Sequence, residues 1–480
     1  MKKEKTQREV RQASLGFAIL TLVVLVAVIA VLLTAANAPI VVVMMLSWLV
    51  LVPFALYLGY NLDQVEKFAL EMIRPAVGVM ALMVAIGGMI SIWLCAGTVP
   101  SIIYWGLKII SPSVFLLVAF ILTSVVSLPI GTSWGAVATI GVAMMGVGLG
   151  LGLPPGLVAG SVISGAYFGN GLSPVSDAPL FMATVTHVKL WDHIKHMSIT
   201  AILTWIISAV LYAVIGMNFT GHTIDMASIN DILTSLEAIF NISWVSLIPM
   251  AVVIVMMVLR YSALMSILCG SVVGILVAVF FQGFSLAEVI NYMNSGFTAT
   301  SDNALVSSLL NRGGFTSMYD LVAIIIGSLG VGGILKGTGV LDVVISALSK
   351  HMKSVRSLTG TTCVSSIITT MMVGTYYFCM TIVSTMMCPL YKKAGYKPEN
   401  AGRIINNIAN CLVAFLPWNV GCQYMATQTG VDVGVFAPFV FFNILVIVLD
   451  FIFGFFNIKA KMYTEEEMEK FAAEEVATSQ

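Results

Sequence analysis

Charged residues are scarce in this chain. Only 10% of its 480 residues are Asp, Glu, Lys or Arg, whereas 59% are hydrophobic. A soluble protein of this length needs far more charge to cover its surface. Apolar runs of about twenty residues recur, and each is long enough for a helix to cross the hydrocarbon core of a bilayer. The sequence therefore predicts a multi-pass membrane protein that is surrounded by lipid and does not bind nucleic acid.

Familiar catalytic and metal-binding motifs are missing as well. The sequence has no HExxH and no paired acidic motif, which argues against a membrane-embedded enzyme. Its seven cysteines form no CxxC pair, and most of them lie inside apolar runs. We expect them to be small buried hydrophobic side chains. No cofactor is expected, apart from Na+ as a transported or coupling ion.

The most informative feature that is present is an internal repeat. Residues 172–188 lie over residues 415–431 as degenerate copies at an offset of 243 residues. In an apolar chain, such a duplication is typical of a transporter built from two halves around a central site. The matches are Pro174 with Pro417, Met182-Ala183-Thr184 with Met425-Ala426-Thr427, Gly131-Thr132 with Gly374-Thr375 and, with a slip of three residues, Gly97-Thr98 with Gly337-Thr338.

Hydropathy and helix-breaking residues predict the membrane segments. Simple spans are expected near 14–34, 39–60, 75–96, 197–217, 243–260, 262–283, 320–336 and 435–456. The segments 113–150 and 155–186, with their counterparts 357–391 and 398–430, contain Gly, Pro and polar residues in mid-run. Irregular backbone at membrane depth must be buried in protein or line a cavity. We expect an all-α polytopic protein with re-entrant hairpins, broken helices and roughly 10–14 membrane segments.

Loop charges indicate that the two copies are inverted. Six basic residues flank the second hairpin, whereas the matching loops of the first copy hold only Lys108. By the positive-inside rule, the second hairpin starts and ends in the cytoplasm and the first starts and ends outside. This is the pattern of two inverted-topology repeats. The six residues are Lys350, Lys353, Arg356, Lys392, Lys393 and Lys397.

The same count places both termini in the cytoplasm. Residues 465–480 are expected to be a solvated helix or a disordered segment with no chemistry. A homodimer is compatible with this layout. The expected parts are a cytoplasmic N-terminal tail (1–13), N-terminal helices (14–60), the first inverted repeat (61–196), linking helices (197–283), the second inverted repeat (284–434), the last helix (435–458) and a cytoplasmic acidic tail (459–480).

Asp177 is the clearest ionisable residue within the apolar body. It lies in the segment 173–179, where two prolines keep the backbone unwound. A carboxylate inside the membrane is costly, so it predicts a cation site or a proton carrier. Freed backbone carbonyls, together with Ser173 and Ser176, would form an oxygen-rich site suited to Na+. The alternative role is that of a helix N-cap.

The repeat and its breaks add further candidate ligands. Helices are expected to end at Gly131-Thr132-Ser133 and at Gly374-Thr375, where backbone N–H dipoles and hydroxyl groups would point at an ion or a carboxylate. The alternative is that these small residues permit close packing of helices. The asparagines could bind a ligand or bond neighbouring helices. His187, His193 and His196 show no metal-binding spacing, so we expect them on the cytoplasmic surface. The predicted binding residues are Asp177, Ser173, Ser176, Thr132, Ser133, Asn170, Thr375, Asn406, Asn407 and Asn419, with Asp177 and Ser176 as sodium ligands.

Several of these motifs carry a family resemblance. The run from GTSWG (131–135) to SPVSD (173–177) resembles the signature region of the NhaC-type sodium/proton antiporter family. LLNRGG at 309–314 and LPWN at 416–419 resemble later motifs of that family, so the resemblance spans about residues 60–440. It implies a bacterial inner-membrane ion exchanger with paired re-entrant hairpins. Members of the family also swap malate for lactate, coupled to sodium and protons.

The chain departs from the family pattern at several acidic positions. Neutral residues stand where the family usually has carboxylates: Asn170, Asn406-Asn407, Thr375 and Ser307 or Ser308. Fewer groups can therefore bind and release protons. Two functions stay open: sodium/proton or sodium-coupled antiport by alternating access around Asp177, and sodium-coupled carriage of a small carboxylate or amino acid without proton antiport.

Overall fold

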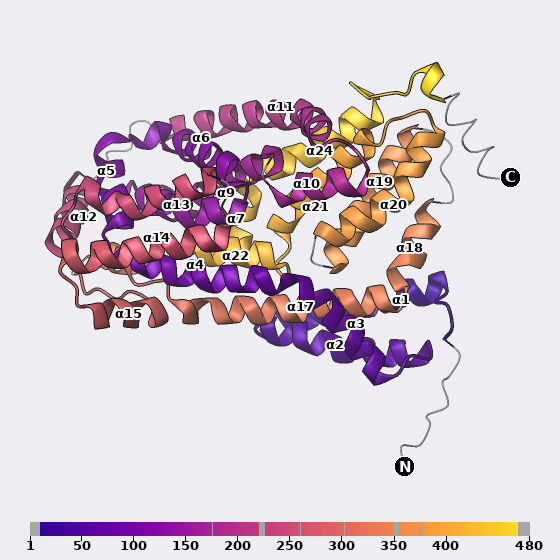
Figure 1. Ribbon diagram of the computed structural model, residues 1–480, viewed down its shortest axis with the longest axis horizontal. Helices are drawn as coiled ribbons and strands as arrows, with labels where there is room; N and C mark the ends of the chain where they lie inside the picture. Colours follow the sequence, from indigo (N-terminus) through magenta and orange to yellow (C-terminus); the bar gives the residue numbers. More distant parts are fainter. Residues whose placement is uncertain are drawn as a thin grey trace, which may run out of the picture.

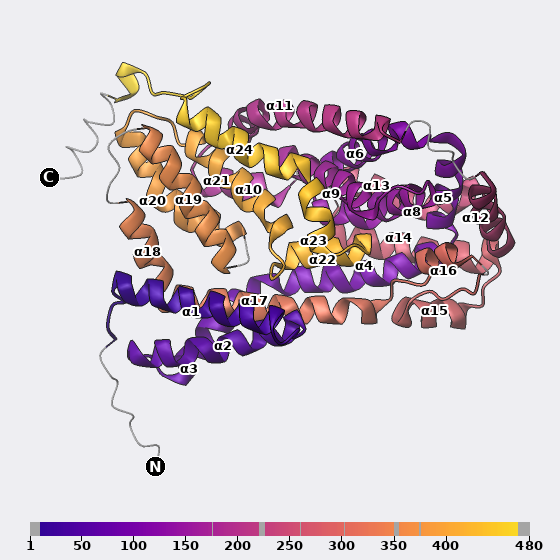
Figure 2. The same ribbon diagram turned by 180° about the vertical axis from the view of Figure 1, so that it is seen from behind.

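The computed structural model describes residues 10–468 except 175, 220–225, 260, 302, 350–354 and 374–375. Within these residues it is helical, and the only β-pairing is an isolated bridge between Tyr396 and Met462. Many of the long helices run along the longest axis of the molecule (Figures 1 and 2). Seven described helices are long and apolar enough to cross a membrane, or up to ten if each of three bent pairs is one span. The all-α membrane fold is confirmed.

Six of the predicted simple spans match single helices, because each is an apolar run with no internal break. These are α1 (Leu15–Thr34), α2 (Ile40–Tyr57), α4 (Val77–Cys95), α11 (Leu190–Met217), α14 (Ala263–Val277) and α17 (Tyr319–Gly337). The shorter helices include α3 (Leu62–Ile73), α5 (Thr98–Ile109), α12 (Met226–Ile239), α15 (Leu286–Ser295), α16 (Ala304–Leu310) and α18 (Val340–Ser349).

Two predicted spans are less regular than the hydropathy suggested. The segment 243–260 holds α13 (Ile248–Val258), whose apolar stretch is bent by 85° from α12. The segment 435–456 is not one helix: α23 (Val433–Phe436) and a short turn are bent by 54° from α24 (Phe441–Phe455). Pro438 lies in that turn, and proline lacks the N–H that a continuous helix needs.

The predicted breaks are present in the first copy. Helix α6 (Pro112–Ile130) ends at Gly131, whose φ of +73° favours glycine. The chain restarts as α7 (Ser133–Ala136) and continues through a π-helical segment, 137–141, into α8 (Val142–Gly150). After α9 (Pro155–Leu172), the second break leads into α10 (Asp177–Val185).

The second copy has helices in the same order. They are α19 (Val355–Val373), α20 (Tyr376–Lys393), α21 (Glu399–Leu412) and α22 (Val420–Thr429). The break between α19 and α20 falls at 374–375, outside the described residues, and the break between α21 and α22 spans 413–419. The repeat in the sequence is therefore also a repeat in helix boundaries.

Contacts between the two copies are reciprocal. Helix α10 packs on α20, while α22 packs on α7 and the segment 137–141. Trp134 stacks on Tyr424, and Phe181 meets Tyr377 edge-on, with ring centroids 5.0 Å apart in both pairs. The sequence offset of 243 residues converts one pair into the other. Such exchange of partners is what a two-fold axis produces. That this axis lies in the membrane plane, as inverted repeats require, stays a prediction.

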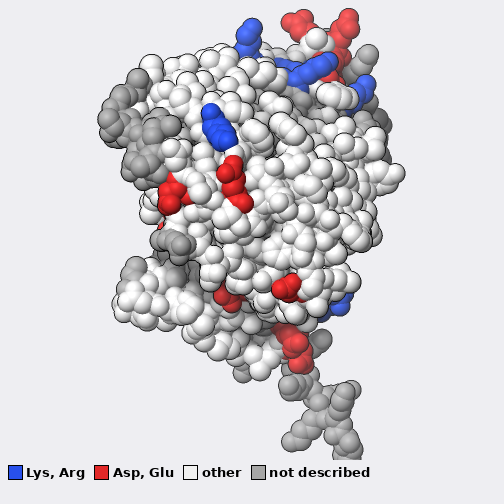
Figure 3. All heavy atoms as spheres, turned by 90° about the vertical axis from the view of Figure 1, so that its left-hand side faces the viewer, with Lys and Arg blue, Asp and Glu red and all other residues white. Residues whose placement is uncertain are grey.

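The beginning of α1 and the segment after α24 lie at the same end of the molecule (Figures 1 and 2). The opposite end, which Figure 3 faces, shows only a few charged groups on an otherwise uncharged surface. This distribution is compatible with both tails lying on the more basic, cytoplasmic side.

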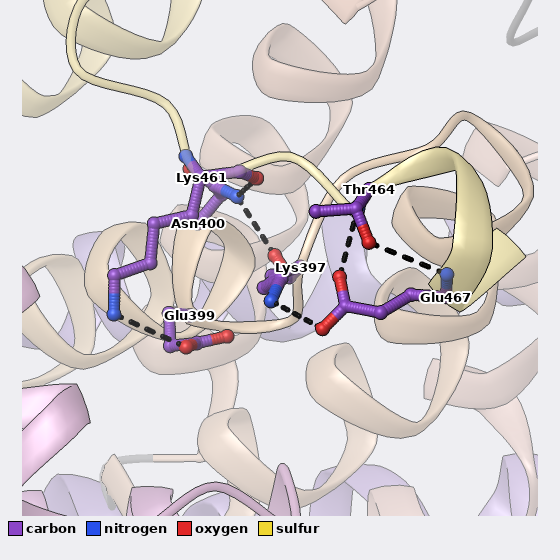
Figure 4. A network of polar contacts seen from close by, with 6 residues as sticks. All are labelled: Lys397, Glu399, Asn400, Lys461, Thr464 and Glu467. Carbon is purple, nitrogen blue, oxygen red and sulfur yellow. Dashed lines mark hydrogen bonds and ion pairs between the residues drawn. The ribbon is translucent and has the colours of Figure 1, made fainter.

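The segment after α24 is anchored rather than free. Lys397 pairs with Glu467 at 2.9 Å, and Lys461 pairs with Glu399 at 3.2 Å (Figure 4). Asn400 exchanges two hydrogen bonds with the backbone of Lys461, at 2.7 and 3.0 Å. Residues 465–468 are helical and partly exposed, in line with the solvated helix that was expected, and Glu467 fastens them to Lys397. Residues 469–480 lie outside the described residues.

Candidate functional site

A cavity of about 530 Å³ lies where the helix breaks of both copies meet. Helices α7, α10, α20 and α22 all begin at or next to it. The first N–H groups of a helix have no partner within the helix and carry its partial positive charge. The polar residues that line the cavity are Thr132, Ser133, Trp134, Tyr167, Asn170, Asp177, Lys336, Tyr376, Tyr377, Thr381, Asn410 and Asn419.

Asp177 is the first residue of α10, and its carboxylate is exposed to this cavity. Tyr376 donates a hydrogen bond to Oδ2 at 2.6 Å, and Tyr377 donates to the same oxygen. Both tyrosines come from α20 in the other copy. Among the described residues, none donates a hydrogen bond to Oδ1, which leaves that oxygen for a cation. Ser176 rather than Asp177 occupies the N-cap position.

A chain of hydrogen bonds lies next to Asp177. Ser176 Oγ donates to Asn170 Oδ1 at 2.8 Å, and Asn170 Nδ2 donates to Asn410 Oδ1 at 3.1 Å. It ties α9 to the start of α10 and to α21 across the two copies. Ser173 and Ser176 are buried and are not among the cavity-lining residues. The hydroxyl of Ser176 is thus directed to Asn170 rather than to the cavity.

The lining itself follows the repeat. At the offset of 243 residues, five lining positions of the first copy fall on lining positions of the second. The cavity therefore lies between the two copies. Its charge differs between them, because the repeat equivalent of Asp177 is the apolar Val420. The pairs are Ser133 with Tyr376, Trp134 with Tyr377, Tyr167 with Asn410, Asn170 with Val413 and Asp177 with Val420.

Lys336 supplies a second charge that the sequence interpretation missed. It lies in the last turn of α17, lines the cavity and is exposed, with Nζ 5.3 Å from the ring centre of Phe378. Asp177 is the only acidic residue among the described residues that line the cavity, and Lys336 adds a positive charge to it. A cation beside the cavity repels sodium and offers a partner to a carboxylate. The sequence feature that could have revealed this charge is a lone lysine at the end of an apolar segment.

Asn419 lines the cavity, and its role in binding stays a prediction. It caps α22, and its Oδ1 accepts a hydrogen bond from Gly421 N at 2.7 Å. Thr132 and Ser133 also line it, at the tip between α6 and α7. Thr375 lies outside the described residues.

Asn406 and Asn407 lie outside the cavity. Asn406 Nδ2 donates to the sulfur of Met197 at 3.4 Å, and Asn407 Nδ2 donates to Asp450 Oδ2 at 2.6 Å. Both asparagines therefore bond neighbouring helices, which was the alternative role. Asp450, missed by the sequence interpretation, is a fully buried carboxylate. The sequence feature that could have revealed Asp450 is a single acidic residue within the apolar run 435–456.

The surface position predicted for two histidines is wrong. His193 and His196 are 0% and 1% exposed. They lie in the first turns of α11, which packs against α21. The polar sequence around them suggested a loop, but the helix already begins at Leu190. His187 is exposed, as expected.

Three relatives and a family model describe what the chain resembles. Residues 165–458 match the model of the Na+/H+ antiporter family. The chain is 32% identical to a malate-2H+/Na+-lactate antiporter of Bacillus subtilis, over 87% of this chain and 90% of that protein. It is 30% identical to the Na+/H+ antiporter NhaC of Alkalihalophilus pseudofirmus, over 93% and 97% of the two chains. It is 31% identical to the arginine/ornithine antiporter ArcD of Halobacterium salinarum, over 87% of each.

Proposed function

Since the chain belongs to the Na+/H+ antiporter family, we propose that it is a secondary active transporter of the cell membrane that exchanges sodium for protons or for an organic solute. The two copies would move against each other by alternating access around the cavity that contains Asp177. The supporting observation is the position of this carboxylate. It starts a helix at a break, is exposed to a cavity between the copies and is held by Tyr376 and Tyr377 of the opposite copy.

Asp177 would bind sodium through Oδ1, which accepts no hydrogen bond from the described residues. Hard cations favour carboxylate, carbonyl and amide oxygens, and Asn170, Asn419 and Thr132 bring such oxygens or hydroxyls to the same cavity. The tyrosine hydroxyls would fix the orientation of the carboxylate. Movement of α10 relative to α20 would then change the site, because the hydrogen bonds to Asp177 cross between these two helices.

A second candidate function is favoured by Lys336. With Asp177 and Lys336 on one cavity, sodium and a small carboxylate or amino acid could bind together, and no proton would need to be exchanged. The relatives differ in the same way: one is named as an exchanger of malate and lactate, and another as an exchanger of arginine and ornithine. Both termini would face the cytoplasm in either case.

The test is transport in proteoliposomes with imposed sodium and proton gradients, comparing wild type with Asp177→Asn. The neutral amide keeps the size of the side chain but removes the charge that holds a cation. We expect sodium-dependent flux to fall by about 10- to 100-fold, since the variant loses a charged ligand worth about 1.5–3 kcal/mol. Proton release on sodium addition to wild type would favour antiport, and its absence would favour sodium-coupled carriage.

Asp320→Asn is the matched control. Asp320 also lies in the first turn of a helix, α17, but it is exposed and does not line the cavity. It should transport as wild type does. Sodium flux in Asp177→Asn equal to that of wild type would refute the role of Asp177.

A further inference from the structure

A second cavity, of about 320 Å³, lies at the other end of α22. Helix α22 begins at Val420 beside the first cavity, whereas Thr427 and Gln428 near its last turn line the second. Helix α17 also lines both cavities, with Met318 just before its start at the second and Ile325 at the first. Six residues of α22 separate Gly421, which lines the first cavity, from Thr427, which lines the second, a rise of about 9 Å.

Arg312 lines this second cavity, and the local sequence fixes its backbone. Gly313 and Gly314 follow it with φ of +86° and +87°. A Cβ on Gly314 would lie 2.3 Å from the backbone nitrogen of Gly296, and a Cβ on Gly313 would lie 2.6 Å from Ser91 Oγ. Only glycine satisfies both the backbone angles and the close approach. The Arg-Gly-Gly run therefore holds Arg312 in one place against the cavity wall.

Among the described residues, the side chain of Arg312 forms no ion pair and no hydrogen bond, and no Asp or Glu lines the cavity. The side chain is half-buried. A cation that is partly withdrawn from water without a partner is destabilised, because its desolvation is not offset by attraction or hydrogen bonding. An anion in the cavity would supply the missing partner, and the planar guanidinium suits the two oxygens of a carboxylate.

The rest of the lining suits a small polar ligand. Thr298, Ser317 and Thr427 bring hydroxyl groups to the cavity. Gln428 is 2% exposed, and its Oε1 has no hydrogen-bond partner among the described residues. Its amide nitrogen meets only the sulfur of Met318, at 4.0 Å. The amide nitrogen is therefore the group of Gln428 that can donate to a carboxylate, whereas Oε1 can only accept from a ligand hydroxyl or N–H. The volume limits that ligand to a small molecule.

We propose that Arg312 and the amide of Gln428 form a binding site for a small organic carboxylate, at the end of α22 opposite to Asp177. This deepens the proposed function, and rests on it, by assigning an organic acid as the solute that exchanges against sodium. The acid binds at Arg312 on one side of the membrane and passes to the cavity of Lys336 and Asp177 when the two copies move.

Purified full-length protein in detergent tests this site by thermal unfolding with acetate, lactate, malate or citrate, and with chloride as an inorganic anion. At least one carboxylate should raise the unfolding temperature of wild type, while chloride at the same concentration should not. Arg312→Gln should weaken that binding by about 10- to 100-fold. Arg312→Lys should bind with intermediate affinity, because lysine keeps the charge but loses the two-pronged geometry.

Arg356→Gln is the matched control, since Arg356 is exposed and lines neither cavity. It should bind the carboxylate as wild type does. Stabilisation by sodium, which depends on the first cavity, reports whether Arg312→Gln is folded. The proposal is overturned if folded Arg312→Gln binds the carboxylate with wild-type affinity, if chloride stabilises equally, or if none of the four acids stabilises wild type.

The two proposals fail separately. If Asp177→Asn loses sodium flux while no carboxylate stabilises wild type, the carboxylate site fails and the sodium site stands. If Asp177→Asn carries sodium as wild type does, the proposed function fails whatever Arg312→Gln shows. Carboxylate binding retained in Asp177→Asn and lost in Arg312→Gln supports two distinct sites.

Discussion

Among single residues, the buried pair of Arg403 and Asp450 shows how a charge is accommodated inside this protein. Arg403 Nε lies 3.1 Å from Asp450 Oδ1, and the two side chains are 2% and 0% exposed. Asn407 satisfies the second carboxylate oxygen. The three residues join α21 to α24. Removing one partner of such a pair leaves the other charge buried without compensation.

We therefore expect Asp450→Asn to destabilise the fold by about 3–5 kcal/mol, because Arg403 would keep its charge in a dry interior. The measurement is the thermal unfolding midpoint of purified protein in detergent. The double variant Arg403→Met/Asp450→Leu should recover much of the loss, since it removes both charges together. A midpoint for Asp450→Asn equal to that of wild type would contradict this account.

At the scale of elements, the segment 459–468 fastens the loop between α20 and α21. Besides the two ion pairs in Figure 4, its backbone bonds to that loop: Lys397 N to Lys461 O at 3.0 Å, and Tyr463 N to Gly395 O at 2.9 Å. The loop leads directly into α21, which carries Arg403 and the cavity residue Asn410. The attachment therefore positions the start of a helix that reaches the site.

The attachment should loosen in acid. The hydrogen bond from Lys397 lowers the pKa of Glu467, and Glu467 in turn raises the pKa of Lys397. Because the pKa of Glu467 is lower in the folded protein than in the unfolded chain, this carboxylate stabilises the contact at pH values above its unfolded pKa. That stabilisation is lost as the pH falls through its folded pKa. The raised pKa of Lys397 adds stabilisation that is lost only as the pH rises through the folded pKa of this lysine. The protection factors of the amides of residues 459–468, which divide out the intrinsic pH dependence of hydrogen exchange, should thus be lower at about pH 4 than at pH 7.

Glu467→Gln is the control for this prediction, because it removes the titrating group and keeps the side-chain length. Its protection factors at the two pH values should differ less than those of wild type. Equal acid-induced loosening in both proteins would show that another group controls the segment.

At the scale of the whole molecule, the two copies enclose one cavity and leave a second beyond α22. The reciprocal pairs Trp134–Tyr424 and Phe181–Tyr377 hold the copies together near the first cavity. Because a packed interface shifts between discrete arrangements rather than deforming continuously, movement of one copy should open one cavity as it closes the other.

Cysteine labelling can follow this movement. Thr381→Cys reports on the first cavity and Thr298→Cys on the second, in a Cys269→Ser background that removes an exposed native thiol. Adding sodium should change the labelling rates of the two reporters in opposite directions, since alternating access exposes one side at a time. Rates that rise and fall together would contradict alternating access and favour an open channel.

Much of the fold followed from local sequence properties. Apolar runs predicted α1, α2 and α14, and Gly131 and the prolines around Asp177 predicted the two breaks of the first copy. The bend before α24 was missed, although Pro438 signalled it. Five predicted ligands line the cavity: Asp177, Asn170, Thr132, Ser133 and Asn419. They were found because each lies at or beside a break.

The sequence by itself determined that the protein is helical and membrane-embedded, that it is duplicated and where its helices break, because these properties depend on near neighbours in the chain. Tertiary structure decided which residues meet. Tyr376 reaches Asp177 across 199 positions, and Asn407 reaches Asp450 across 43. It also decided that His193 is buried and that Arg312 faces a cavity. Such contacts depend on how whole helices pack, and the hydropathy of a single segment does not specify which other segments it will contact.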